Sequence, residues 1–183
     1  METDPADFRP DPMEEIYALR MVRAGFLDVA IEIEADLRLM LIDYFLTEAR
    51  KVDLFWDFYE SRGTLGPVVY RFKKVLVAER EALAAERDFS AQQVDALLHA
   101  LDELVQHRNR FAHDPMSQHF QVDVEAGSVV RNEWRIGQRR EDGPYFTIES
   151  ANDAYEKARA CEDLVIRVRL PLERAARRPP PTG

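Results

Sequence analysis

A single long run of apolar residues at helical spacing limits the folds open to this chain. Between Met13 and Arg50 there is no proline, and one apolar row recurs every three or four positions: Leu19, Phe26, Ala30, Ile33, Leu37, Met40 and Tyr44. A second set widens that row: Leu27, Ile31, Leu41 and Phe45. The pattern predicts a long helix that is buried against several neighbours. Gly25 is expected to bend or break this helix.

The middle of the chain predicts shorter helices. A short buried helix is expected around a cluster of aromatic residues, Phe55, Trp56, Phe58 and Tyr59, followed by a turn marked by Gly63, Gly66 and Pro67 and a helix over 68–77. Ser90 and Gln93 form a capping-box signature that begins the next helix. Asp114-Pro115 is expected to end it, because a residue that precedes proline is pushed out of the helical conformation.

After this proline the period of the apolar residues changes. Alternation at Phe120, Val122 and Val124, and again in SVVRNEWRIG, predicts two or three short antiparallel strands over 119–149. The turns are expected at Ala126-Gly127 and over 141–144, and the third strand in YFTIE. Ser150, with Asp153, is expected to cap a last helix that runs to about Leu170.

The expected fold is therefore mainly α, a bundle of four to five helices with a small antiparallel β insertion before the last helix. One domain is expected over 13–172, between a flexible lead-in at 1–12 and a disordered tail at 173–183. With 46% hydrophobic and 32% charged residues, the composition is that of a soluble globular protein.

The charge balance and the terminal sequence exclude several classes of protein. Lys and Arg number 25 against 34 Asp and Glu, for a net charge of −9, which argues against a broad basic face for duplex nucleic acid but allows a small basic cleft. Cys161 is the only cysteine, so no internal disulfide or cysteine metal cluster is expected, and it fits a small buried position. Neither a signal peptide nor a bilayer-crossing segment is evident, so a cytoplasmic protein without a membrane partner is expected.

The segment QHRNRFAHDP carries the strongest functional signal. The apolar row Val94, Leu97, Leu101 and Leu104 continues to Arg108 and Phe111, so a guanidinium occupies a position expected for leucine. Burying an unpaired charge is costly, so Arg108 is expected to meet a carboxylate, a partner subunit or a ligand. His113 lies about 140° around a helix from Arg108. The two can converge only where the helix unwinds at Asp114-Pro115, or across a symmetric dimer.

Neighbouring residues on the same helix refine this interpretation of Arg108 and His113. Asn109 precedes His113 by four residues and is placed to hydrogen-bond its ring, whereas Arg110 and Asp114 form what we expect to be a plain surface contact. The helix dipole favours the protonated form of a histidine in the last turn, and a nearby arginine opposes it. A histidine balanced in this way suits general acid–base chemistry near neutral pH.

A metal site is an alternative for the histidines. His107, His113 and His119 are spaced six apart, which turns them away from one helix face, and zinc sites on helices favour ligands three or four apart. His113-Asp114 resembles the His-Asp pair of metal phosphohydrolases, but no further ligands are evident. Neither a metal nor a cofactor is therefore expected.

The residues RNRFAH resemble the Arg-Asn-x3-His form of the Arg-x4–6-His motif of the HEPN superfamily, in which the motif closes a long helix of a small bundle. The long first helix, the turn GTLGPVV and the final helix after an insertion are similar to the HEPN layout, including its mannitol-repressor-like branch. The resemblance covers about residues 14–172, with motif-level similarity only over 108–113.

This resemblance implies a metal-independent endoribonuclease, of toxin or RNA-processing type, that acts as a homodimer with the two motifs facing each other. Arg108 would bind the scissile phosphate, His113 would move protons, and Asn109 would orient the histidine or contact phosphate. An antitoxin or a regulatory protein is the expected partner beside RNA.

Other interpretations compete with this one. A HEPN-like domain can act as a non-catalytic regulator or interaction module, in which case Arg108 is expected to form a structural ion pair with Glu34. NEWRIGQRR places basic residues around an aromatic ring, which predicts an RNA contact through Trp134, Arg135, Arg139 and Arg140, with Arg131 nearby, although such a run is often a solvated hairpin. An enzyme of small-molecule metabolism has little support, because no phosphate loop or nucleophile elbow is present.

Overall fold

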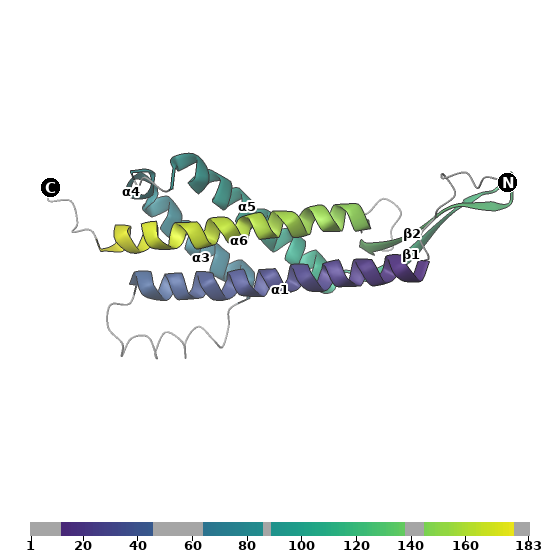
Figure 1. The fold of residues 1–183 in the computed structure, drawn as a ribbon, viewed down its shortest axis with the longest axis horizontal. Coiled ribbons are helices and arrows are strands. Elements are labelled where there is room, and N and C mark those ends of the chain that lie inside the picture. Colours follow the sequence, from purple (N-terminus) through teal and green to yellow (C-terminus); the bar gives the residue numbers. More distant parts are fainter. Residues whose placement is uncertain (1–11, 46–63, 86–88, 138–144, 178–183) are drawn as a thin grey trace, which may run out of the picture. The chain divides into compact units, whose positions relative to one another are not determined.

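The computed structural model describes residues 12–45, 64–85, 89–137 and 145–177. Its elements, in chain order, are α1 (Pro12–Phe45), α3 (Leu65–Ala78), α4 (Arg80–Ala84), α5 (Ala91–His113), β1 (Met116–Asp123), β2 (Ser128–Gly137), β3 (Tyr145–Phe146) and α6 (Ile148–Ala176) (Figure 1). The mainly α fold with a small antiparallel sheet before the last helix is confirmed. The helix predicted around 55–59, the end of the first predicted helix at 46–50 and the turn at 141–144 lie outside the described residues.

The chain divides into two compact units, where the sequence favoured one helical domain. The sheet unit comprises residues 1–27 and 109–155, and the bundle unit comprises residues 28–108 and 156–183. The boundaries fall within α1, α5 and α6, and each unit is described by itself. No helix in the described ranges is both long and apolar enough to cross a membrane.

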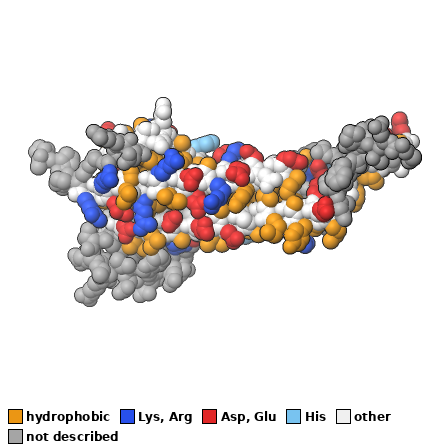
Figure 2. All heavy atoms as spheres, in the orientation of Figure 1, with side chains coloured by type: hydrophobic (Ala, Val, Ile, Leu, Met, Phe, Trp, Pro, Cys, Tyr) orange, Lys and Arg blue, Asp and Glu red, His pale blue; other side chains and the backbone are white. Residues whose placement is uncertain are grey.

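Ion pairs on the surface of the bundle unit show which helices are neighbours. Arg80 Nη2 lies 2.6 Å from Asp95 Oδ2, which joins α4 to α5, and Lys73 of α3 pairs with Asp102 of α5. Arg169 Nη2 lies 3.7 Å from Asp43 Oδ2, which joins α6 to α1. Exposed pairs of this kind contribute little to stability, so the buried apolar rows hold the unit together. Figure 2 shows acidic and basic side chains interspersed over the helices on the face in view.

The apolar row predicted for the first helix is buried from Leu19 to Met40, and Cys161 is buried on α6 as expected. The prediction of burial is wrong for two residues of the wider set: Ile31 is 65% exposed and Phe45 is 58% exposed. In the bundle unit the buried side of α1 centres on Val29, Ile33 and Met40. At about 100° per residue, Ile31 therefore falls on the far side of the helix.

The sheet unit is built around a cluster of three aromatic rings. Phe111, at the end of α5, stacks on Phe26 of α1 with ring centroids 4.5 Å apart, and it contacts Phe146 of β3 at 4.7 Å. The sheet has the order β1-β2-β3 and is antiparallel throughout, with Met116 opposite Ile136 and an irregularity between Gln121 and Val122. The end of the motif helix is thus fixed to α1 and to the sheet by one buried ring.

Several element ends were predicted well. Ser90 N donates to Gln93 Oε1 at 2.7 Å and Gln93 N to Ser90 Oγ at 3.3 Å, so the capping box at the start of α5 is confirmed. α5 ends at His113, directly before Asp114-Pro115, as predicted. The three strands are also confirmed, with β1 beginning three residues before the predicted start.

The predicted ends of other helices and strands were wrong. Thr147 rather than Ser150 caps α6: Thr147 N donates to Ser150 Oγ at 2.9 Å and Ser150 N to Thr147 Oγ1 at 3.4 Å, so the third strand stops at Phe146. α6 continues past Leu170, through Pro171, to Ala176. Gly66 and Pro67 lie in the first turn of α3 rather than before it, where proline costs no intrahelical hydrogen bond.

Gly25 does not interrupt α1, which is continuous through it. A Cβ atom at this position would lie 3.4 Å from Cε2 of Tyr155, on α6 in the same unit. The glycine therefore allows close approach of an aromatic ring rather than a bend in the helix.

Candidate functional site

Arg108 is half-buried on α5 in the bundle unit, and the residues of the row that precedes it are buried as predicted: Val94, Leu97, Leu101 and Leu104. Because part of the side chain reaches solvent, its charge does not need a carboxylate partner inside the core. The arginine thus ends the buried row of its unit without an unpaired charge in the interior.

The expected structural bridge from Arg108 to Glu34 is not present. Glu34 Oε1 accepts a hydrogen bond from Arg38 Nη2 at 2.6 Å, one turn along α1. Within the described ranges no ion pair joins Arg108 to Glu34. The carboxylate proposed for Arg108 is therefore engaged by Arg38.

Asn109 and His113 belong to the sheet unit, and both are exposed. No hydrogen bond joins them in the part of the chain that the structure describes, so the predicted contact is not formed. Asp114 N donates to Arg110 O at 2.8 Å, which keeps the backbone helical to the end of α5. Since α5 does not unwind before His113, helix geometry keeps the directions of side chains 108 and 113 about 140° apart. The route that requires an unwound helix end is therefore not seen.

Arg110 is not the plain surface contact that the sequence suggested. Its guanidinium carbon lies 4.1 Å from the centroid of the Phe146 ring, and Nε lies 3.4 Å from Asp114 Oδ2. Its Nη2 atom is buried and has no hydrogen-bond partner among the described residues. Sequence spacing showed the Asp114 contact but not Phe146, which follows after two intervening strands.

A second arginine missed by the sequence supports the end of α5. Arg23 Nη2, on α1, donates to the backbone oxygen of Ala112 at 3.2 Å. The last carbonyl groups of a helix lack partners within it and carry the negative end of its dipole, so a cation here stabilises the helix end. The approach of α1, which depends on tertiary packing, gave no local signal around the motif.

The predicted basic patch on β2 is only partly described. Arg135 pairs with Glu133, which is buried, and its guanidinium lies 3.7 Å from the Tyr145 ring centroid, so its charge is already engaged. Trp134 is half-buried, and its Nε1 atom has no hydrogen-bond partner among the described residues. Arg139 and Arg140 lie outside those residues, as does the side chain of Arg131. An RNA contact there stays a prediction.

The remaining histidines are scattered. Over the described ranges, no three His, Cys, Asp or Glu side chains are grouped so that they could hold a metal ion. His99 Nε2 lies 3.8 Å from Glu103 Oε1, an ion pair only when the imidazole is protonated.

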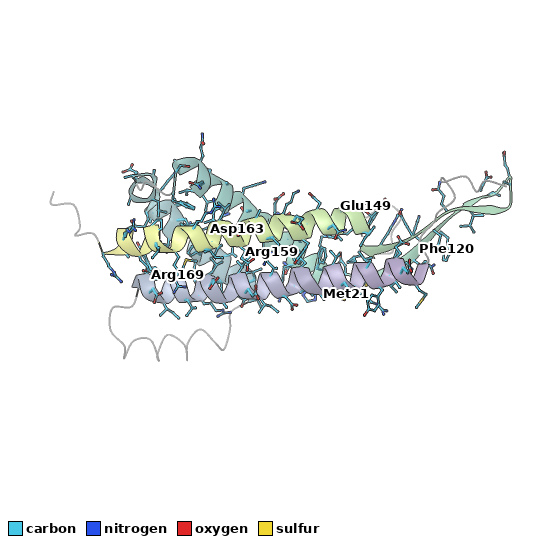
Figure 3. All side chains as sticks on the ribbon, viewed as in Figure 1. Met21, Phe120, Glu149, Arg159, Asp163 and Arg169 are labelled. Atoms are coloured by element: carbon cyan, nitrogen blue, oxygen red, sulfur yellow. The ribbon has the colours of Figure 1, made fainter. Side chains whose placement is uncertain are left out.

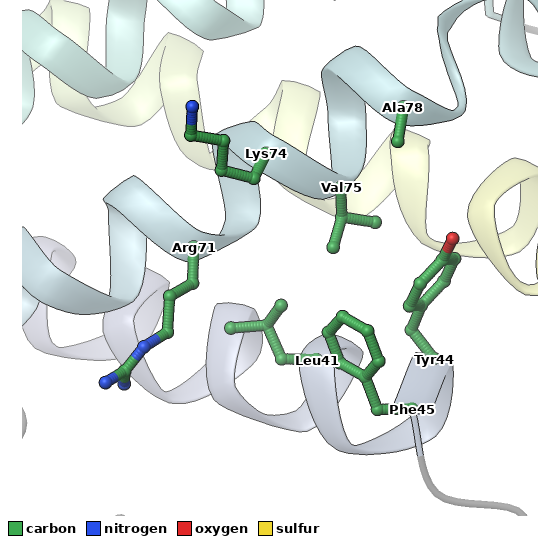
Figure 4. A pocket seen from close by; sticks show the side chains of 7 residues that line it. All are labelled: Leu41, Tyr44, Phe45, Arg71, Lys74, Val75 and Ala78. Atoms are coloured by element: carbon green, nitrogen blue, oxygen red, sulfur yellow. The ribbon is translucent and has the colours of Figure 1, made fainter.

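A separate cavity of about 360 Å³ lies between α1 and α3 in the bundle unit (Figure 4). Its lining is mainly apolar, with two cations at the edge: Leu41, Tyr44, Phe45, Arg71, Lys74, Val75 and Ala78. The Tyr44 hydroxyl donates to the Glu79 carboxylate. Partial burial, followed by this hydrogen bond and the carboxylate charge, raises the pKa of Tyr44 from 10.0 to about 12.

We expect this tyrosine to make stability fall at high pH. A neutral phenol donates to Glu79, whereas a phenolate is repelled by it, so the contribution is complete below the ordinary pKa of 10.0 and is lost as the pH rises through about 12. The measurement is the free energy of unfolding of wild type and Tyr44→Phe across this range. The gap between the two proteins is expected to narrow with rising pH, and a constant gap would contradict the assignment.

Comparison of the chain with protein-family profiles, with curated proteins and with solved structures gave no match. The resemblance to the HEPN superfamily therefore stays a prediction from the sequence.

Proposed function

We propose that this chain is a metal-independent endoribonuclease whose active site is completed across a symmetric dimer, with Arg108 of one copy beside His113 of the other. The observation that carries the proposal is the state of the arginine: it ends a buried row, reaches solvent, and has no ion pair among the described residues. His113 and Asn109 are exposed on the same helix. A half-buried cation with an exposed histidine is a combination suited to phosphate chemistry.

The reaction follows from the chemistry of the two side chains. The ribose 2′-oxygen forms a bond to phosphorus while the bond from phosphorus to the 5′-oxygen breaks, which leaves a 2′,3′-cyclic phosphate and a 5′-hydroxyl. His113 takes the 2′-hydroxyl proton as general base and then donates it to the leaving 5′-oxygen, so the imidazole returns to its starting state. Arg108 stabilises the charge that develops on the phosphoryl oxygens. Asn109 contacts phosphate or the ring of His113 from the partner copy.

The test is cleavage of single-stranded RNA in EDTA by wild type, Arg108→Ala and His113→Ala. Each variant is expected to lose at least about 100-fold in cleavage rate, since both the proton-transfer group and the phosphate-binding group act in the transition state. The products are expected to carry 2′,3′-cyclic phosphate ends. His99→Ala is the matched control, because it removes an exposed imidazole from the same helix and should leave the rate unchanged.

Two outcomes contradict the proposal. Equal cleavage by all four proteins would assign the activity to a contaminant. Absence of cleavage by folded wild type on a broad pool of RNA sequences would favour a non-catalytic role.

The second candidate is a regulatory or protein-interaction module, with an antitoxin-like or regulatory protein as partner. It is favoured by exposed apolar side chains on the hairpin of β1 and β2: Phe120, Val122, Val124 and Val129. Exposed apolar residues that gather in one place mark interaction surfaces more often than isolated ones do. This candidate predicts that Arg108→Ala and His113→Ala leave partner binding intact.

A further inference from the structure

Strand β1 forms one edge of the three-stranded sheet, since β2 lies between it and β3. An edge strand presents backbone N–H and C=O groups that no neighbouring strand satisfies, and such an edge is a template for another strand. The pairing of β1 with β2 determines which backbone groups of β1 face outward.

Gly137 N donates to Pro115 O at 3.1 Å, so these two residues form a hydrogen-bonded pair of the antiparallel ladder. Such pairs alternate along antiparallel strands, which makes Ser117 and His119 members of hydrogen-bonded pairs as well. The residues between them direct both backbone groups away from β2. The outward groups of the β1 edge therefore belong to Met116, Gln118 and Phe120.

The opposite side of β2 confirms this pattern. Trp134 is opposite Gln118, so its N–H is expected to point away from β1. It does so, because it donates to Glu15 Oε1 of α1 at 3.3 Å. No hydrogen bond to the outward backbone groups of Met116, Gln118 or Phe120 occurs within the residues that the structure describes.

The side chains of β1 do nothing to protect this edge. Proteins commonly block edge strands with lysine, proline or an inward-pointing charge. From Met116 to Val122 the strand has neither lysine nor proline, and His119 is its only titratable residue. Phe120 is 53% exposed on this strand (Figure 3).

We propose that β1 pairs with β1 of a second copy of this chain, antiparallel, about a twofold axis that passes through Gln118. In this register Gln118 lies opposite Gln118 of the other copy, and Met116 lies opposite Phe120. The outward backbone groups of all three residues in each copy thereby form hydrogen bonds with the other copy. In a single copy these groups can bond only to water.

Self-complementarity identifies the occupant as a second copy. The proposed register pairs the three outward residues of one copy with the same three residues of the other. It also places the thioether of Met116 against the ring of Phe120, and contacts between sulfur and an aromatic ring are favourable. On the other face Ser117 lies opposite His119, so no like charges meet. An unrelated extended peptide would match the backbone but has no such reason to match the side chains.

This contact goes beyond the proposed ribonuclease site and is separate from it. It uses the outward backbone groups of Met116, Gln118 and Phe120 on β1, whereas Arg108, Asn109 and His113 lie on α5. The two contacts involve different residues, so Phe120→Lys tests the strand contact and His113→Ala tests the catalytic one.

Disulfide trapping of Gln118→Cys tests the register. Cα atoms of a hydrogen-bonded antiparallel pair lie about 5.5 Å apart, within the range that a disulfide spans. Under mild oxidation this variant is expected to form a covalent dimer at least about tenfold faster than Val124→Cys, because pairing raises the local thiol concentration. Val124 is the control, since it is 90% exposed at the hairpin end and lies outside the pairing.

The native thiol does not interfere with this experiment. Cys161 is buried, and burial, with the nearby Glu162 charge, raises its pKa to about 12, so it holds little reactive thiolate. Equal trapping rates for Gln118→Cys and Val124→Cys would overturn the proposed register.

Sedimentation of the unmodified protein gives a second, independent measurement. Wild type is expected to associate. The Phe120→Lys variant is expected to associate more weakly, because its lysine ammonium would be buried against the apolar side chain of Met116 in the other copy. Wild type that stays monomeric at high concentration, or a Phe120→Lys variant that associates as tightly as wild type, would overturn the proposal. If Phe120→Lys associates less but cleaves RNA like wild type, the strand contact stands apart from the catalytic one.

Discussion

Mixing Arg108→Ala protein with His113→Ala protein is expected to restore about one quarter of wild-type RNA cleavage, although each variant alone is inactive. In a symmetric dimer each site takes its arginine from one copy and its histidine from the other. A mixed dimer then has one site with both residues and one with neither. Random exchange makes about half of all dimers mixed, and half of their sites are intact. Cleavage rates after co-refolding of the two proteins give the measurement.

The control for this experiment replaces one partner by the double variant Arg108→Ala/His113→Ala. Mixed with Arg108→Ala, it can form no intact site, so any cleavage there reports contamination. If the two single variants exchange subunits, as two different tags would show, and cleavage is still not restored, then the sites are not shared between chains. Restoration is a result that a merely structural role for either residue does not produce.

Phe111→Ala is expected to lower the free energy of unfolding by about 3–5 kcal/mol, because it removes a fully buried ring and leaves a cavity. The ring contacts Phe26 at 4.5 Å and Phe146 at 4.7 Å, so the loss affects α1, α5 and β3 together. Urea unfolding followed by circular dichroism measures the change. Val124→Ala, at an exposed position, should shift the value by less than about 0.5 kcal/mol. A loss below about 1 kcal/mol for Phe111→Ala would show that the aromatic cluster does not hold the sheet unit together.

The elements that the sequence predicted well depend on local interactions. The capping box of Ser90 and Gln93 joins residues three apart, and Asp114-Pro115 acts on its own backbone. Both can be recognised without knowledge of the rest of the fold. The apolar row of α5 is equally local, since its spacing follows from the geometry of one helix.

The features that the sequence did not predict depend on contacts between distant residues. Arg110 lies against Phe146, and the approach of β3 is set by how β2 pairs, not by residues near the motif. Ile31 was assigned to a set that widens the buried row of α1, and the width of the buried side is decided by the packing of α1 and not by spacing. Thr147 competes with Ser150 for the cap of α6, and both carry the same hydroxyl group, so composition cannot rank them.

For the candidate site, the sequence supplied the residues but not their geometry. It identified Arg108, Asn109 and His113 and offered two ways for the first and last to meet. The regular end of α5 removes one of these ways. Asn109 and His113 satisfy the i,i+4 rule yet form no hydrogen bond, because spacing gives proximity whereas side-chain rotation decides the bond.

The hydrogen bond from Trp134 N–H to Glu15 has a consequence for solubility. Together with β3, which covers Ile136 and Gly137, the Glu15 carboxylate occupies part of the sheet side that faces away from β1. A sheet with two open edges can add strands at both and grow into a fibre, whereas a sheet open on one side only is used up by a single pairing. One acidic residue of α1 thus limits strand addition on the far side of β2, which lowers the tendency of the sheet to grow into fibres.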